Sequence, residues 1–135
     1  MTSRLHHIGL AVLDLDEAVA YYERHHGLVV TSEHTSAADG VREVLLEAGG
    51  CQVQLLQPTS DESPVGRFLA RRGPGLHHLA FEVDDVDEEL ARLAGAGAQL
   101  VDRQARAGTG GLRIAFVHPS GAMGVLTELV QRSPT

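Results

Sequence analysis

The chain contains an internal repeat, and this repeat constrains the fold more than any other feature of the sequence. Residues 5–30 read LHHIGLAVLDLDEAVAYYERHHGLVV, and residues 76–101, which start 71 positions later, read LHHLAFEVDDVDEELARLAGAGAQLV. The two segments are identical at 9 of 26 positions. Two copies are too few for a solenoid, in which three or more repeats stack. The repeat therefore predicts a fold that is built from two similar halves.

Each copy begins with the alternating pattern of a β-strand and continues as a helix. In residues 5–12, the bulky apolar side chains fall on one face, and His7 falls on the other face beside small residues. Residues 76–83 repeat this division and place His78 with the small residues. Asp14 and Asp85 each stand three positions before a glutamate, which is the spacing of a helix capping box. These signals predict one strand and one capped helix at the start of each half.

Further apolar runs complete the two halves. We expect strands at residues 28–33, 41–47 and 51–57 in the first half, and at 98–103, 112–117 and 124–130 in the second. Ser63-Pro64 has the order expected at the start of a linker helix, and His34 and His118 are expected in loops. We therefore predict a single α+β domain over residues 1–135, in which two tandem βαβββ modules form a curved mixed sheet around a metal site. The repeats cover about residues 5–57 and 76–130, with the linker helix within 59–75.

Composition narrows the functions that are open to the chain. A chain of 135 residues buries roughly two-thirds of its unfolded surface, so it needs neither a disulfide nor a metal to fold. The net charge of −7 argues against a nucleic-acid partner, because such partners require clustered basic residues. The sequence shows no signal peptide and no apolar run of about 20 residues, which argues against a membrane partner. Cys51 is the single cysteine, which fits a reducing compartment. We predict a cytoplasmic protein.

Four residues are candidate metal ligands. His7 and His78 occupy equivalent positions in the two repeats. Gln54 and Glu128 fall on the last predicted strand of each half, and they are equivalent if the second half carries a three-residue insertion. Each half then contributes one imidazole and one oxygen ligand. Such a set suits a divalent first-row metal with open positions for a chelating substrate. A single histidine on a strand is more often structural, so the prediction depends on the four residues together.

The sequence also resembles a known enzyme family. The segments GLHHLAFEVDDVD, GTGGLRIAFVHP and GVLTELV, together with GVREVLL and QVQLLQP, are similar to methylmalonyl-CoA epimerases of the vicinal-oxygen-chelate superfamily. The resemblance extends from residue 5 to about residue 130. It implies that His7, Gln54, His78 and Glu128 hold the metal, with Co²⁺ or Mn²⁺ expected first and Zn²⁺, Ni²⁺ or Mg²⁺ as alternatives. It also implies a homodimer.

The resemblance further implies a two-base epimerisation of an acyl-CoA substrate. Glu43 and Glu128 are the expected acid/base pair, which removes and returns the proton on the α-carbon of a thioester, while the metal stabilises the enolate. Without the resemblance, Glu43 would be read as a solvated strand carboxylate. The chain has no lysine, so the CoA phosphates must be bound by backbone N–H groups or arginines. Arg103, Arg106 and Arg113 flank the GTGG segment and are candidates for this role.

Three other functions share the predicted scaffold. A glyoxalase-like isomerase or lyase is the nearest alternative among enzymes. An extradiol dioxygenase would use two histidines and one glutamate on iron, and Gln54 as a fourth ligand argues against it. A drug-sequestering protein of the bleomycin-resistance type would bind a small molecule without a metal, so it has no need for the four candidate ligands.

Overall fold

The computed structural model describes residues 3–132, which form eight strands and three α-helices. The first βαβββ module consists of β1 (Arg4–Ala11), α1 (Leu15–His26), β2 (Val29–Ser36), β3 (Val41–Ala48) and β4 (Cys51–Pro58). The linker helix α2 (Pro64–Arg72) follows. The second module consists of β5 (Gly75–Val83), α3 (Val86–Gly95), β6 (Arg106–Ala107), β7 (Arg113–Val117) and β8 (Thr127–Gln131). The predicted α+β class and the two tandem modules are confirmed.

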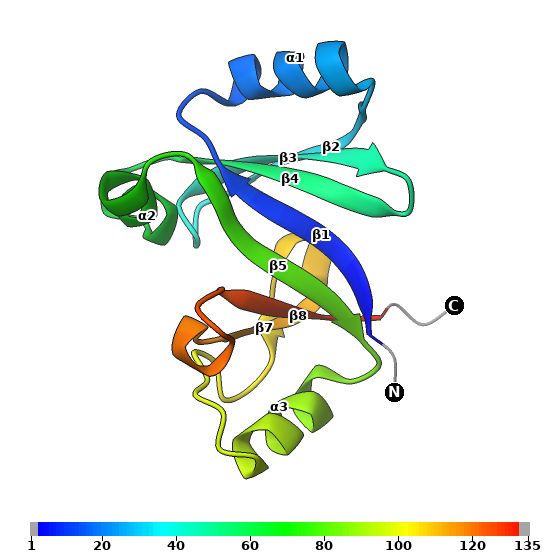
Figure 1. Ribbon diagram of the computed structural model, residues 1–135, viewed down its shortest axis with the longest axis vertical. Coiled ribbons are helices and arrows are strands. Elements are labelled where there is room, and N and C mark those ends of the chain that lie inside the picture. The colour runs from blue at the N-terminus through cyan, green and yellow to red at the C-terminus, as the bar shows by residue number, and fades with distance from the viewer. Residues whose placement is uncertain (1–2, 133–135) are drawn as a thin grey trace. The chain divides into compact units, whose positions relative to one another are not determined.

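The chain divides into two compact units that correspond closely to the two repeats. The N-terminal half contains residues 7–77, and the C-terminal half contains residues 78–132 together with residues 3–6. In the N-terminal half the strand order is β2-β3-β4-β1, and in the C-terminal half it is β5-β8-β7-β6 (Figure 1). In each half the first strand is parallel to the last one, and the remaining neighbours are antiparallel. Within residues 3–132, no helix is long and apolar enough to cross a membrane.

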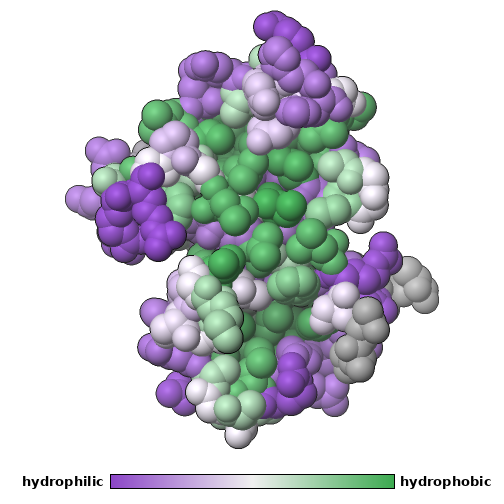
Figure 2. Space-filling view, in the orientation of Figure 1, coloured by the Kyte–Doolittle hydropathy of each residue, from purple (hydrophilic) through white to green (hydrophobic). Residues whose placement is uncertain are grey.

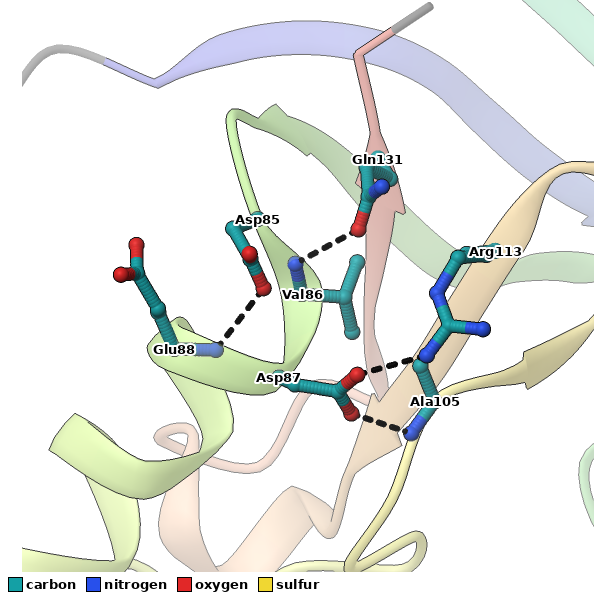
Figure 3. A network of polar contacts seen from close by, with 7 residues as sticks. All are labelled: Asp85, Val86, Asp87, Glu88, Ala105, Arg113 and Gln131. Atoms are coloured by element: carbon teal, nitrogen blue, oxygen red, sulfur yellow. Dashed lines mark hydrogen bonds and ion pairs between the residues drawn. The ribbon is translucent and has the colours of Figure 1, made fainter.

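The two repeat helices begin where the sequence predicts. The Asp14 carboxylate accepts a hydrogen bond of 3.0 Å from the Glu17 N–H, and the Asp85 carboxylate accepts one of 3.0 Å from the Glu88 N–H (Figure 3). These bonds satisfy N–H groups that have no partner within the helix. Helix α1 ends at Gly27, whose φ of 67° lies in the left-handed region where a side chain is unfavourable.

The two repeat helices share a second feature that the sequence analysis did not predict: in each half, a glutamine side chain binds the first N–H group of the helix. The side-chain oxygen of Gln57, on β4, accepts a hydrogen bond of 2.7 Å from the Leu15 N–H at the start of α1. The side-chain oxygen of Gln131, on β8, accepts one of 3.1 Å from the Val86 N–H at the start of α3 (Figure 3). The two glutamines are 74 positions apart and the two helix starts are 71 apart. The structure therefore confirms the three-residue insertion in the second half.

In the N-terminal half, the sheet has an apolar cluster on each face. Leu15 of α1 packs on Val44, Leu46 and Leu55, which lie on the face that α1 covers. On the opposite face, Ala11, Val41, Leu56 and Val65 form a second cluster, with Phe68 and Leu69 of α2 packed against it. Hydrophilic residues occupy the outward surfaces of α1 and α2, whereas apolar residues gather over the strands of this half (Figure 2). We call the face opposite α1 the N-terminal site face.

The C-terminal half has the same construction. Val86 and Leu90 of α3 are buried against Val83, Ala115 and Leu129 on one face of the sheet. Ala80, Ile114 and Val130 form a smaller cluster on the other face, with Leu112 and Phe116 packed against it. We call this second face, opposite α3, the C-terminal site face.

The predicted strand at 98–103 is wrong. This segment runs beside β7, but only Leu100 forms a bridge, with Val117. The N–H groups of Val101 and Asp102 both donate to the Phe116 carbonyl, and the Asp102 carboxylate accepts a hydrogen bond of 2.8 Å from the Phe116 N–H. The Asp102 side chain thus takes the N–H group that a neighbouring strand would pair with, so a regular ladder does not form. The edge strand of this half is the short β6 instead.

Two further expectations from the sequence need correction. His34 lies in strand β2, opposite Glu43 of β3, and not in a loop. The last strand starts at Thr127 and not at residue 124, because Gly124 belongs to a turn in which its N–H donates to the Pro119 carbonyl and its φ is 88°. The other predicted strands are present with boundaries shifted by up to three residues.

Replacing Asp14 by alanine should destabilise the protein by about 1 kcal/mol, since the Glu17 N–H loses its acceptor. Asp16→Ala is the matched control, because Asp16 is exposed in the first turn of α1 and loses only its favourable position near the helix dipole, worth about 0.3–1 kcal/mol. Urea denaturation followed by circular dichroism measures both free energies of unfolding. A larger loss in Asp16→Ala than in Asp14→Ala would contradict the assigned cap.

Candidate active site

His7, Gln54 and Glu43 all lie on the N-terminal site face. His7 alternates along β1 with Ala11, which belongs to the apolar cluster on that face. In the same way Gln54 alternates with Leu56 on β4, and Glu43 alternates with Val41 on β3. All three polar side chains are buried, with exposed fractions of 8% or less. Polar groups are rarely buried without a specific partner, so this cluster is a candidate site.

Gln54 and Glu43 are joined directly. The Gln54 amide Nε2 donates a hydrogen bond of 2.5 Å to Glu43 Oε2. The other oxygen of each side chain is also buried, and neither Gln54 Oε1 nor Glu43 Oε1 has a hydrogen-bond partner within the described residues. A buried oxygen without a partner is costly, about 1–3 kcal/mol. The arrangement therefore holds two acceptor oxygens ready for a metal ion or a substrate.

His78 and Glu128 lie together on the C-terminal site face. His78 Nε2 is 3.1 Å from Glu128 Oε1, and both side chains are buried, with exposed fractions of 3% and 7%. The ring of Phe116 contacts the His78 imidazole edge to face, with centroids 5.8 Å apart. In this half, the structure thus brings an imidazole nitrogen and a carboxylate oxygen close enough together to bind the same metal ion. Both are atoms that bind divalent metals.

The two halves place these residues in the same register. Gln54 pairs with Gly9, two residues after His7, and Glu128 pairs with Ala80, two residues after His78. Gly9 and Ala80 are equivalent positions of the repeat. The predicted equivalence of Gln54 and Glu128 is therefore confirmed by strand pairing. Each half presents one histidine and one oxygen-bearing side chain at matching positions on its site face.

Three further residues complete the description of these surfaces. Gln52 pairs with His7 on the N-terminal site face, and its buried Oε1 has no hydrogen-bond partner within residues 3–132. In the sequence, the alternation of Gln52 with Gln54 is the signal that places Gln52 on this face. Phe116, which contacts His78, gave no such signal. His77 packs edge to face on Phe68 of α2, with centroids 4.9 Å apart.

Comparison with known proteins identifies the family. The model of the glyoxalase/bleomycin resistance protein/dioxygenase superfamily matches residues 6–116. An ethylmalonyl-CoA/methylmalonyl-CoA epimerase from Cereibacter sphaeroides is 32% identical over 133 residues, which cover 97% of this chain and 99% of the relative. The family model reaches residue 116, within the second repeat, and the relative covers nearly the whole chain.

Solved structures agree with this result. A methylmalonyl-CoA epimerase from Mycobacterium tuberculosis is 42% identical, with a TM-score of 0.91 over 96% of this chain and 88% of the other. A methylmalonyl-CoA epimerase in complex with methylmalonyl-CoA and NH₄⁺ is 39% identical, with a TM-score of 0.93 over 98% and 96% of the two chains. The chain is therefore an enzyme that belongs to the methylmalonyl-CoA epimerase family of the glyoxalase/bleomycin resistance protein/dioxygenase superfamily.

Proposed function

We propose that this enzyme inverts the α-carbon of a malonyl-type CoA thioester, with methylmalonyl-CoA as the first expected substrate. The observation that carries the proposal is the matched register of the two halves, in which each supplies a histidine and an oxygen ligand. In the N-terminal half, the Glu43 carboxylate is hydrogen-bonded to Gln54. The relatives support the substrate, since one is named for both ethylmalonyl-CoA and methylmalonyl-CoA and another was solved with methylmalonyl-CoA. The proposal includes a homodimer, which rests on the family resemblance alone.

The metal site proposed from the sequence consists of His7, Gln54, His78 and Glu128. The chemistry of these residues fits a divalent cation, since Gln54 Oε1 is a buried acceptor without a partner within the described residues, and His78 lies beside a carboxylate. Co²⁺ or Mn²⁺ remains the first expectation, with Zn²⁺, Ni²⁺ and Mg²⁺ as alternatives. When bound, the cation would supply positive charge that stabilises the negative charge developing on the substrate oxygen.

Glu43 and Glu128 are the proposed acid/base pair. Inversion needs one group to remove the α-proton and a second group, on the opposite face of the carbon, to return a proton. Glu43 Oε2 is held by the Gln54 amide, which leaves the buried Oε1 as the oxygen that can take or give a proton. Glu128 is the second carboxylate and comes from the other half of the chain. The proposal assigns one of these two carboxylates to each face of the α-carbon.

Incubation of the metal-loaded enzyme with (2R)- or (2S)-methylmalonyl-CoA in heavy water tests the proposed function. Either epimer should convert to the other, and the product should carry deuterium at C2, because a carboxylate that exchanges with solvent returns the proton. Mass spectrometry and chiral analysis measure the two results, and ethylmalonyl-CoA is run in parallel. Sequestration of a small molecule without reaction is the outcome that would contradict the proposal.

A further inference from the structure

Strands β6 and β7 place two arginines on opposite faces of the C-terminal sheet. Arg106 pairs with Ile114, and Ala107 pairs with Arg113. Directly paired residues share a face, and Ile114 belongs to the apolar cluster on the C-terminal site face. Arg106 is therefore on the face that carries His78 and Glu128. Arg113 is on the opposite face, where its Nη2 lies 2.6 Å from the Asp87 carboxylate of α3 (Figure 3).

Contacts with Asp102 and Phe116 hold the Arg106 side chain. Its Nε lies 3.3 Å from Asp102 Oδ1, and Asp102 Oδ2 accepts a hydrogen bond from the Phe116 N–H. Its guanidinium carbon lies 5.6 Å from the centroid of the Phe116 ring, which is a cation–π distance. The same ring contacts His78, with centroids 5.8 Å apart, and in the strand order β5-β8-β7-β6 its strand lies between those of His78 and Arg106. One aromatic ring thus separates the guanidinium from the His78 imidazole.

We propose that Arg106 binds a phosphate group of the CoA portion of the substrate, an inference that rests on the proposed function. A CoA thioester carries its reacting acyl group at one end and its phosphates at the other, with the pantetheine arm between them. The Phe116 ring lies between His78 and the Arg106 guanidinium. Arg106 is therefore placed to contact the part of the substrate beyond the pantetheine arm and not the acyl group. Guanidinium is also the side-chain group that best matches the geometry of phosphate oxygens.

The other two candidate arginines are less suited to this role. Arg103 and Arg113 line a groove of about 470 Å³ between α3 and the segment before β6, on the face opposite the candidate ligands. Asp87 lies in the same groove, and its carboxylate accepts a hydrogen bond of 2.9 Å from the Ala105 N–H. This N–H bond, followed by the Arg113 hydrogen bond, lowers the pKa of Asp87. Asp87 therefore stays ionised and paired with Arg113, and the groove lies on the face opposite His78 and Glu128, away from the side on which the substrate is proposed to bind.

Two substrates and three variants test the proposal. Arg106→Ala should raise KM for methylmalonyl-CoA about tenfold, because a charge-assisted hydrogen bond is lost, while kcat changes less than about twofold. KM for methylmalonyl-pantetheine, which has no phosphate, should not change. Arg113→Ala is the matched control and should leave KM for both thioesters unchanged. Arg106→Lys keeps the charge without the planar fork, so its KM should fall between those of Arg106→Ala and the wild type.

Three results would overturn the assignment. Wild-type KM in Arg106→Ala would show that the guanidinium does not contact the substrate. An equal rise in KM for both thioesters would place Arg106 at the acyl or pantetheine portion, or would reveal a disturbed Phe116. A rise in Arg113→Ala would move the phosphate site to the groove. Calorimetric binding of CoA itself to wild type and Arg106→Ala gives the same comparison without catalysis, so it decides the role of Arg106 even if the wild type does not epimerise the substrate.

Discussion

Replacing Glu43 by glutamine should stop epimerisation while the protein keeps its metal and its fold. Glutamine retains an oxygen that can accept the hydrogen bond from Gln54 Nε2, so Gln54 should keep its orientation and its Oε1 should remain available. The amide cannot take or give the α-proton, and the loss of a general acid/base lowers rates by about 10²–10⁴. Steady-state assays with each epimer measure this loss, and metal analysis of the purified variant confirms that the metal is retained.

The Glu43→Gln variant also separates a two-base mechanism from a one-base mechanism. Glu128 remains in the variant, so one epimer should still exchange its C2 proton with heavy water although it is not inverted. Loss of exchange for both epimers would indicate that Glu43 alone serves both faces. Glu47→Gln is the matched control, because Glu47 lies on the same face of β3 but is exposed, and its carboxylate accepts a hydrogen bond from the Gly50 N–H. Full activity in Glu43→Gln would show that Glu43 is not a catalytic group.

Replacing either His7 or His78 by alanine should remove tightly bound metal. The wild type is expected to hold about one divalent ion per chain. Loss even of a residue that only supports a metal ligand typically costs 10–100-fold in affinity, so loss of a ligand should cost at least about a hundredfold. The fold should survive, since neither histidine belongs to the apolar clusters of its half. Elemental analysis after dialysis against chelator measures the metal, and circular dichroism follows the fold.

His25→Ala provides the control for both histidine variants. His25 is exposed in the last turn of α1, where its contact is with the Tyr21 ring, so its loss should leave metal content unchanged. Unchanged metal content in both His7→Ala and His78→Ala would contradict the proposed ligand set. Loss of metal in only one variant would limit the site to one half of the chain.

Local signals in the sequence were sufficient to predict the repeat, the capped helices and most of the strands. Asp14 and Asp85 cap the helices that they were predicted to cap, because an N-cap hydrogen bond spans only three residues and is encoded by adjacent side chains. Alternation along β1 and β5 correctly separated the face under the helices from the face with the polar residues, because side chains on a strand alternate whatever the strand pairs with. The four-ligand set remains a prediction from the sequence and the family resemblance.

Pairing between distant segments decided the features that the sequence did not show. The segment at 98–103 has an apolar pattern, but the Asp102 carboxylate takes the Phe116 N–H and prevents a regular strand. The Gln54 amide meets Glu43 because β3 and β4 pair in one particular register, and a shift of one residue would turn either side chain to the other face. The pairing of β6 with β7 likewise places Arg106 with the candidate ligands and Arg113 against α3. Strand register depends on tertiary packing, so only the structure could distinguish these arginines.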